Sequence, residues 1–401
     1  MSNDLVADAE RQMPSVIELA QKLIQQPSRG GIDDYGPVLS VLETWLTERS
    51  LPNRRLHDPA GQLVGLLVEI VGQHPGPWWT LDACVDTAPF GDESAWNFSP
   101  TCGDVADGWL HGRGAADSKL AASMFCHIAA GLHGRTQALR GGLAVLLDVD
   151  EHTGAFGGAR AYLSDPLSER PAGVMIGYPG LEEVVVGGRG LWRATVSVYA
   201  PSGHSGSSRT VLNAVSRAAR LVQLLDEAEL PGRPAPGPEA ETFPLPPKLT
   251  VTAVHGGQGF TVSADRCELN LDIRTTPTFG AKDAEALVRR AVDTLDTELP
   301  GPMPSHIEHH VDWPPFRLDS HEQPAAALLG AAHSMGLQVG TKTAGPSNIG
   351  NLLASLNVPA TAGFGVPYEG LHAVNERAHL AEVPTVYAVY HQAVRTLLRT
   401  A

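Results

Sequence analysis

The sequence has no apolar run that approaches the roughly 20 residues needed to cross a bilayer as a helix. Its first residues, Met1 to Met13, are polar and acidic instead of basic and then apolar, which predicts neither export nor membrane insertion. Basic side chains are also few, with 29 Lys and Arg against 44 Asp and Glu and a net charge of -15. Because this charge repels nucleic acid and anionic lipid, we expect neither as a partner, and a small molecule or another protein instead.

Cysteine is scarce as well. Four cysteines are scattered along the chain without any CxxC spacing, namely Cys84, Cys102, Cys126 and Cys267. Neither a disulfide framework nor a zinc ribbon is therefore expected. Free thiols suit the reducing cytoplasm, so we expect a cytoplasmic protein.

The 401 residues are enough for two domains or for one domain with a large insertion. In the first part of the chain, apolar spacing predicts helices over 14–25 and 35–51 and strands over 63–71, 78–85 and 172–176. From about residue 314 a similar pattern resumes, with helices expected over 324–335, 348–356 and 384–398 and a short strand over 359–363.

The segment between these parts has a different character. Apolar and polar residues alternate over 192–199 and 267–274, a further strand is expected over 249–254, and helices over 211–225 and 284–295. Such alternation leaves one sheet face wet and predicts an open antiparallel sheet with two helices on its other face. A proline-rich run over 231–247 predicts a long loop.

The overall prediction is an α/β fold. We expect a catalytic domain of residues 1–187 and 303–401, with a mixed β-sheet flanked by helices, and an inserted α+β domain of residues 188–302.

Reactive side chains follow the apolar run from Leu143 to Leu147. The run leads into Asp148-Val149-Asp150-Glu151-His152-Thr153-Gly154 and then into small residues. Because α/β enzymes present reactive groups at the carboxyl ends of strands, Glu151 is a candidate base and His152 a candidate metal ligand. The alternative interpretation is a solvated acidic turn.

Three more segments offer similar groups after strands or at helix starts: Cys84-Val85-Asp86, Gly114-Ala115-Ala116-Asp117, and His372 followed by Glu376. We predict that Asp117 begins a closely packed helix, where exposed N–H groups favour a carboxylate. All four segments, in their order along the chain, resemble motifs of the M20 metallopeptidase and aminoacylase family, which includes acetylornithine deacetylase, succinyl-diaminopimelate desuccinylase and carboxypeptidase G2. The family patterns GHxDxVP, GRGxxDxKG and DEExG correspond here to Ala83–Pro89, Gly112–Lys119 and Asp150–Gly154.

The departures from the family patterns concern the metal ligands. The resemblance implies one ion held by the positions of Cys84, Asp117 and Tyr178, and a second held by Asp117, His152 and His372. A tyrosine hydroxyl, with a pKa near ~10, is a poor neutral ligand, so the first site is doubtful. Two imidazoles and a carboxylate suit Zn²⁺ and also Fe²⁺, so we expect one catalytic zinc ion in the second site, with Glu151 as the general base.

Two residues near the first site have several interpretations. Cys84 is a thiolate ligand, a nucleophile or a small buried residue that fills the space of a lost ligand. Tyr178 is better explained as a hydrogen-bond donor to substrate or a space filler than as a ligand. The resemblance gives Asp86 the role of orienting a ligand, although its usual imidazole partner is replaced by Cys84.

Further roles are implied in the inserted domain, which acts in the family as a lid and dimerisation domain. His204 corresponds to a residue that stabilises the oxyanion, often from a partner subunit. Asn213 matches a substrate-binding position, and Arg274 matches an arginine that binds a substrate carboxylate. The alternative for Arg274 is an ion pair with Asp272.

The resemblance implies a metal-dependent hydrolase that cleaves an N-acyl amino acid or a small peptide, in a homodimer formed through the inserted domain. Two alternatives stay open. One is a repurposed, non-hydrolytic enzyme of specialised metabolism that forms amides or cyclises its substrate. The other is a non-catalytic binding protein, which the retention of Asp117, Glu151 and His372 disfavours.

Overall fold

The computed structural model describes residues 2–208, 212–232 and 243–399. The chain forms two compact units. The large unit runs to Val186 and includes Leu318–Lys342 and the chain from Asn348 onward, whereas the small unit contains Gly187–Arg317 and Thr343–Ser347. No helix among the described residues combines the length and the apolarity needed to cross a membrane.

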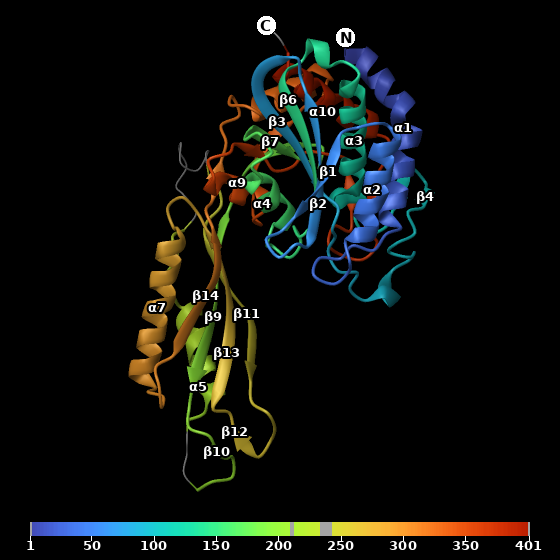
Figure 1. The fold of residues 1–401 in the computed structure, drawn as a ribbon. Coiled ribbons are helices and arrows are strands. Elements are labelled where there is room, and N and C mark those ends of the chain that lie inside the picture. Colours follow the sequence, from blue (N-terminus) through green and yellow to red (C-terminus); the bar gives the residue numbers. More distant parts are fainter. Residues whose placement is uncertain (1, 209–211, 233–242, 400–401) are drawn as a thin grey trace. The chain divides into compact units, whose positions relative to one another are not determined.

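The large unit is built on a mixed six-stranded sheet in the order β1-β2-β6-β3-β7-β17 (Figure 1). Its strands are β1 (Asn53–His57), β2 (Leu63–Val71), β3 (His74–Cys84), β6 (Arg140–Asp148), β7 (Pro171–Ile176) and β17 (Ala360–Thr361). β1, β2 and β6 pair antiparallel, and β6, β3, β7 and β17 pair parallel. The parallel strands are almost entirely buried, which explains why they appear in the sequence as continuous apolar runs.

Helices pack around this sheet. They are α1 (Ser2–Ile24), α2 (Gly36–Glu48), α3 (Leu120–His133), α4 (Gly157–Ser164), α8 (Ala325–Ser334), α9 (Ile349–Ser355) and α10 (Val383–Leu397). The small residues that begin α4 are required by its close packing on β6, because a Cβ atom at Gly158 would lie 2.4 Å from the Asp148 Cβ. The predicted mixed sheet flanked by helices is confirmed.

Short strands complete the chain. A four-stranded sheet of the large unit contains β4 (Val105–Ala106), β5 (Trp109–His111), β18 (Tyr368–Glu369) and β19 (Arg377–His379). The remaining short strands are β8 (Glu183–Gly188), β15 (Phe316–Arg317) and β16 (Gly340–Ala344). None of these strands was predicted. β4, β5, β15, β18 and β19 have only two or three residues, too few for a measurable periodicity, whereas β8 and β16 have six and five residues and were missed as well.

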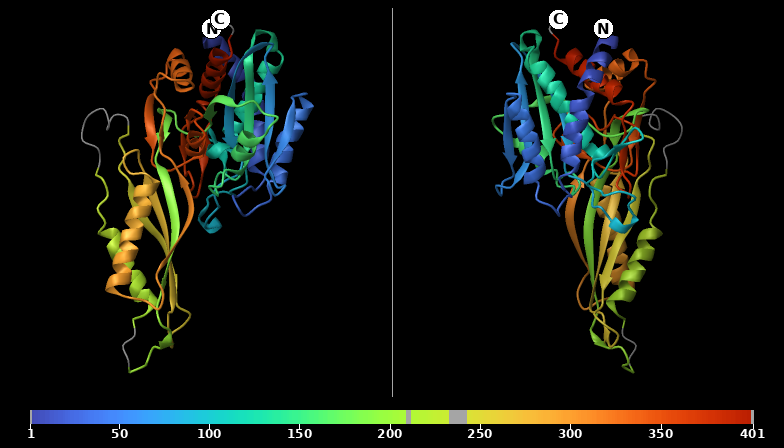
Figure 2. Two further views of the ribbon diagram at one scale, coloured as in Figure 1. Left: turned by 60° about the vertical axis from the view of Figure 1, so that its left-hand side comes forward. Right: turned by 90° about the vertical axis from the view of Figure 1, so that its right-hand side faces the viewer.

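The small unit is an antiparallel sheet of four strands in the order β11-β13-β9-β14. Its elements are β9 (Gly190–Tyr199), β11 (Lys248–Gly256), β13 (Arg266–Thr275), β14 (His306–Trp313), and the helices α5 (Ala214–Asp226) and α7 (Ala281–Glu298). Both helices lie along one face of the sheet (Figure 2) and share a core with the apolar residues of β9 and β13. A short ladder of β10 (Gly203–His204) and β12 (Val262–Ser263) lies beside the end of β9 and β13.

Two details differ from the sequence prediction. The predicted boundary at residue 302 precedes β14, which pairs with β9, so the small unit extends to Arg317. β14 was not predicted because its residues are mostly polar and show no apolar alternation. An edge strand needs few buried side chains, so such a pattern is not required of it. Of the predicted loop over 231–247, residues 233–242 lie outside the described part of the chain, as does residue 211 of the predicted helix over 211–225.

Candidate metal centre

The parallel strands bring several of the predicted residues to one edge of the sheet. Cys84 ends β3 and lies opposite Asp148, the last residue of β6, in the parallel register. Asp86 follows β3, Glu151 and His152 follow β6, and Tyr178 follows β7. Because parallel strands end at the same edge, residues that are distant in sequence meet there.

Asp117 comes from an irregular segment, Ala115–Lys119, that precedes α3. Its backbone is not helical, with φ -125° and ψ 91°. The prediction that Asp117 begins the helix is therefore wrong in detail, because the backbone N–H groups of Gly114, Ala116 and Asp117 donate to Glu376 instead.

Glu376 joins this segment to the loop that carries His372. Its Oε1 accepts the N–H groups of Gly114, Ala116 and Asp117 at 3.0, 3.1 and 3.3 Å. Its Oε2 accepts a hydrogen bond from Arg113 at 2.6 Å, and both side chains of this ion pair are buried. The role of this pair was not predicted, although Arg113 stands in the Gly-Arg-Gly motif and Glu376 was noted after His372.

Asp117, His152 and His372 converge on one point. The Asp117 Oδ2 lies 2.9 Å from the His372 Nε2 and 3.4 Å from the His152 Nε2. One ligand atom from each residue lies within 4.8 Å of the other two. The Asp117 carboxylate is buried, but the attraction of both imidazoles outweighs this burial and lowers its pKa.

The residues fit a metal ion. The His152 side chain is 5% exposed, and neither ring nitrogen has a hydrogen-bond partner of acceptable geometry among the described residues. Buried polar atoms of this kind are rare, and a cation between the two imidazoles and the Asp117 carboxylate would satisfy the Nε2, which faces Asp117. Burial by itself would lower the pKa of His152. Without a cation, the carboxylates of Asp117 and Asp86 outweigh this effect and raise the pKa to about 11.

Asp86 supports the ligand loop. Its carboxylate accepts the backbone N–H groups of Glu151 at 3.3 Å and His152 at 3.0 Å, and its Oδ2 lies 3.4 Å from the His152 Nδ1. Asp86 therefore supports this loop through its backbone N–H groups, in the absence of the imidazole that Cys84 replaces.

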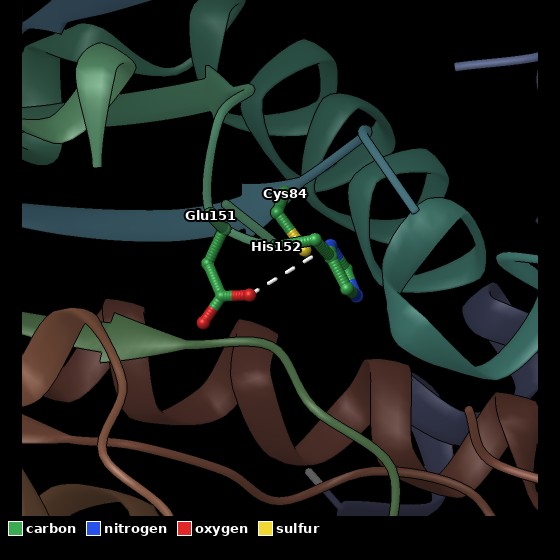
Figure 3. Close-up of side chains that lie close together, drawn as sticks. All are labelled: Cys84, Glu151 and His152. Atoms are coloured by element: carbon green, nitrogen blue, oxygen red, sulfur yellow. Dashed lines mark ion pairs between the residues drawn. The ribbon is translucent and has the colours of Figure 1, made fainter. Parts of the chain in front are cut away.

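Glu151 lies beside the triad, and one oxygen of its carboxylate faces the His152 ring (Figure 3). Its Oε2 is 3.7 Å from the His152 Nδ1. Burial, followed by the negative charges of Asp117 and Asp86, outweighs the attraction of His152 and raises the pKa of Glu151 to about 8. A carboxylate with such a pKa holds a proton near neutral pH and can exchange it.

Cys84 and Tyr178 adjoin the same carboxylates. The Cys84 Sγ donates to the Asp117 Oδ1 over 3.6 Å, and the Ser118 hydroxyl donates to the same oxygen at 2.8 Å. Burial and the neighbouring negative charges raise the pKa of the Cys84 thiol and of the Tyr178 hydroxyl. A neutral Tyr178 hydroxyl agrees better with a donor or a space filler than with a ligand.

Lys119 is a buried amine behind the Asp117 segment. Its Nζ donates to the carbonyl oxygens of Leu23 and Gln26, both at 2.9 Å, where α1 ends. Burial lowers the pKa of Lys119 to about 7.

The predicted substrate-binding residues of the insertion lie in the small unit. His204 is exposed, and its Nδ1 accepts the Gly206 N–H at 3.0 Å. The Asn213 Oδ1 accepts the Ser216 N–H and caps α5. Arg274 forms an ion pair with Asp272 at 2.6 Å, so their roles toward a substrate stay predictions.

Comparison with known proteins agrees with this geometry. The sequence pattern of Peptidase family M20/M25/M40 matches residues 82–396. Succinyl-diaminopimelate desuccinylase of Bradyrhizobium sp. (strain ORS 278) is 26% identical over 94% of this chain and 98% of its own. Acetylornithine deacetylase of Photorhabdus laumondii is 27% identical over 72% of this chain and 74% of its own.

Solved structures share the fold. The dipeptidase Dug1p of Saccharomyces cerevisiae superposes with a TM-score of 0.78 at 15% identity, over 99% of this chain and 98% of its own. The family pattern spans both units and the four segments that meet at the sheet edge. The chain therefore belongs to the M20/M25/M40 peptidase family.

Proposed function

We propose that this protein hydrolyses the amide bond of an N-acylated amino acid or a short peptide, using one divalent ion held by Asp117, His152 and His372. Family membership supports metal-dependent amide hydrolysis in general. The observation that carries the single-ion assignment is the convergence of these three residues, together with the buried His152 ring, whose nitrogens have no hydrogen-bond partner among the described residues. At the other oxygen of Asp117, a thiol and a hydroxyl occupy the positions where a second ion would need ligands.

The side chains divide the chemistry between them. When bound, a zinc ion supplies positive charge that polarises an amide carbonyl and makes water more acidic. Glu151, which lies beside the triad, takes the proton of the attacking water and delivers it to the leaving nitrogen. Asp86 holds the backbone of Glu151 and His152 in place during this transfer.

His204 is the proposed donor to the oxyanion. Because its Nδ1 accepts the Gly206 N–H, the neutral ring carries its proton on Nε2. An exposed Nε2–H group can donate to the oxygen that becomes negative during amide cleavage.

Replacement of Glu151 tests the catalytic assignment. The Glu151→Gln variant should lose at least about 100-fold in kcat, because the amide cannot accept a proton, and it should still bind one ion per chain. Metal analysis and hydrolysis of a panel of N-acyl amino acids and dipeptides measure both quantities. Glu183→Gln, which changes an exposed carboxylate paired with Lys342, is the control.

Three outcomes would contradict the proposal. Full activity of Glu151→Gln removes the proposed base, and two tightly bound ions per chain, or none, removes the single-ion assignment. If the metal-loaded natural protein cleaves no member of the panel, a non-hydrolytic reaction replaces hydrolysis.

We also propose a homodimer formed through the small unit. The edge strand β11 carries uncharged residues from Leu249 to Val254, and Val254 is 49% exposed. The opposite edge, β14, contains Glu308, Asp312 and a register shift between His309 and Val311, features that discourage pairing. A second copy of β11 is therefore the partner that the open edge fits best.

A further inference from the structure

The chain that follows α1 returns to the metal centre. The Gly30 N–H donates to the Thr87 carbonyl oxygen and the Thr87 N–H donates to the Ser28 carbonyl oxygen, both at 2.9 Å. The Ser28 hydroxyl donates to the Val85 carbonyl oxygen at 2.7 Å. Because Val85 and Thr87 flank Asp86, the segment from Ser28 to Gly30 fixes the backbone of the residue that supports the ligand loop.

Gly30 brings this segment against a metal ligand. A Cβ atom at Gly30 would lie 3.0 Å from the His152 Cβ, 3.4 Å from the His152 carbonyl carbon and 3.3 Å from the Asp86 Oδ2. These distances are shorter than ordinary contacts, so a side chain there would displace its neighbours by a few tenths of an ångström. The Gly30 backbone lies outside the left-handed region, so the lack of space, and not backbone freedom, requires a glycine here.

The part of the chain that would yield is the ligand loop. The residues from Glu151 to Ala155 are half-buried or exposed, and the loop is held by the hydrogen bonds of its N–H groups to Asp86. A displacement of this turn costs little core packing. It does change the position of the His152 ring, and metal sites require their ligands to be held within about 0.5 Å.

The segment that carries Gly30 is braced on its own side. The Arg29 Nε and Nη2 donate to the two carboxylate oxygens of Asp33, both at 2.8 Å, and the Arg29 backbone N–H donates to the Asp33 Oδ2 at 2.8 Å. The guanidinium carbon of Arg29 also lies 4.5 Å from the centre of the Phe90 ring. A methyl group on residue 30 should therefore push His152 and leave the segment in place.

We propose that Gly30 is a positioning residue of the metal centre, because its missing side chain lets the segment lie against His152 and thereby sets where the imidazole meets the ion. Asp86 holds the ligand loop by hydrogen bonds, and Gly30 limits it by contact. The inference rests on the proposed ion at Asp117, His152 and His372.

The Gly30→Ala variant tests this role with Co²⁺ as a spectroscopic probe, because the visible absorption of bound Co²⁺ depends on its coordination geometry. The variant should bind one Co²⁺ per chain with a spectrum that differs from that of the natural protein. Its affinity for Zn²⁺, measured by competition with a chelator, should fall at least about tenfold. The thermal midpoint of the metal-free variant should equal that of the metal-free natural protein, because the displaced turn lies outside the core.

Gly256→Ala is the matched control. A Cβ atom at Gly256 would lie 2.7 Å from the Cys267 Sγ, within the small unit, so this variant has a similar steric conflict far from the ligand loop in sequence. Its thermal midpoint should fall, and its Co²⁺ spectrum and Zn²⁺ affinity should stay unchanged.

If Gly30→Ala does not fold, Asp33→Ala takes its place. This variant removes the acceptor of three hydrogen bonds from Arg29 and adds no volume. Because the brace of the segment is lost, the Co²⁺ spectrum should change and the Zn²⁺ affinity should fall at least about threefold.

The inference and the proposed function fail separately. A natural protein that binds no Co²⁺ overturns both. If the natural protein binds one Co²⁺ and the folded Gly30→Ala variant keeps the same spectrum and the same Zn²⁺ affinity, the metal centre stands and Gly30 has no positioning role.

Discussion

The Glu376 carboxylate serves two loops at once. One oxygen accepts three backbone N–H groups from the Asp117 segment, and the other pairs with Arg113, which also donates to the Ala373 carbonyl oxygen at 2.8 Å. Because Ala373 follows His372, the Glu376–Arg113 pair sets the positions of two proposed metal ligands, Asp117 and His372. Glu376 is therefore a positioning residue, since it touches the supports of the ligands and not the reacting atoms.

The Glu376→Gln variant tests this role. The amide keeps an acceptor for the N–H groups but leaves Arg113 as an unpaired buried charge, so we expect a loss of about 3–5 kcal/mol in the free energy of unfolding. Affinity for Zn²⁺ should fall about 10- to 100-fold, as for other supporting partners of metal ligands. Urea denaturation and competitive metal titration measure the two effects.

Glu369→Gln is the matched control, because Glu369 pairs with Arg377 at the surface and exposed pairs contribute little. This variant should keep its stability and its metal affinity. Equal behaviour of the two variants would mean that burial of the Glu376 pair has no consequence for the metal centre.

At the scale of elements, β3 and β6 carry two buried carboxyl groups behind the metal centre. Asp82 and Asp148 lie on these neighbouring strands, and both side chains are fully buried. Burial raises the pKa of Asp82 to about 7, and burial with the nearby negative charges of Asp82 and Asp86 raises the pKa of Asp148. The fold therefore favours the protonated, uncharged form of these groups.

This arrangement predicts a pH-dependent stability. The pKa of Asp82 is higher in the folded protein than its ordinary 3.8. Its contribution to the stability of the fold is therefore fully present below about pH 4 and is lost as the pH rises to about 7. The asparagine of Asp82→Asn cannot ionise. The free energy of unfolding of the metal-free variant, relative to that of the natural protein, should therefore rise by about 1 kcal/mol per pH unit in this window. Urea denaturation at pH 5, 6 and 7 measures the gap.

Asp92→Asn is the control, because the pKa of Asp92 is shifted in the opposite direction to that of Asp82. Asp92 is exposed, and its bonds to Ser94 lower its pKa, so this side chain stabilises the fold at higher pH and loses that effect in acid. A gap for Asp82→Asn that stays constant with pH would show that Asp82 titrates normally.

The sequence predicted the longer elements because their patterns are strong. β9 and β13 alternate apolar and polar residues almost without exception, and the predicted strand over 267–274 lies within β13 (Arg266–Thr275). β14 was missed as part of the insertion because its side chains are polar and mostly exposed. Periodicity reports burial, so an edge strand with little burial leaves almost no signal.

The metal centre was only partly accessible from the sequence. Asp117, His152 and His372 could be named because motifs identify ligand types. The hydrogen bonds of Glu376 to the Asp117 segment could not be predicted, because they depend on backbone N–H groups that carry no sequence identity. The hydrogen bonds of Asp86 to the backbone of Glu151 and His152 depend likewise on the path of the chain.

At the scale of the whole molecule, the two units have opposite kinds of β-sheet. The large unit buries its parallel strands among helices, whereas the small unit has an antiparallel sheet with one wet face and two free edges among the described residues. Such edges are either protected or used for pairing. β14 is protected by charge, and β11 is not.

The Val254→Lys variant tests the use of β11. A lysine at this position places two like charges, one from each copy, in the proposed β11–β11 contact, so the dimer should convert into monomers with at least a tenfold weaker association. Light scattering over a range of concentrations measures the molar mass. Glu308→Lys on β14 should leave the mass unchanged, and a natural protein that is monomeric throughout the range would exclude the dimer.

The buried amine of Lys119 has a consequence at the amino end of the chain. Its acceptors, the carbonyl oxygens of Leu23 and Gln26, belong to the last turn of the first helix and the residues just after it. Truncation of this helix would leave the Lys119 Nζ, two residues from Asp117, without these acceptors, at a cost of about 1–3 kcal/mol. Removal of this helix would also uncover the core to which its buried residues Leu19, Leu23 and Ile24 belong, so we expect it to unfold the large unit and abolish turnover.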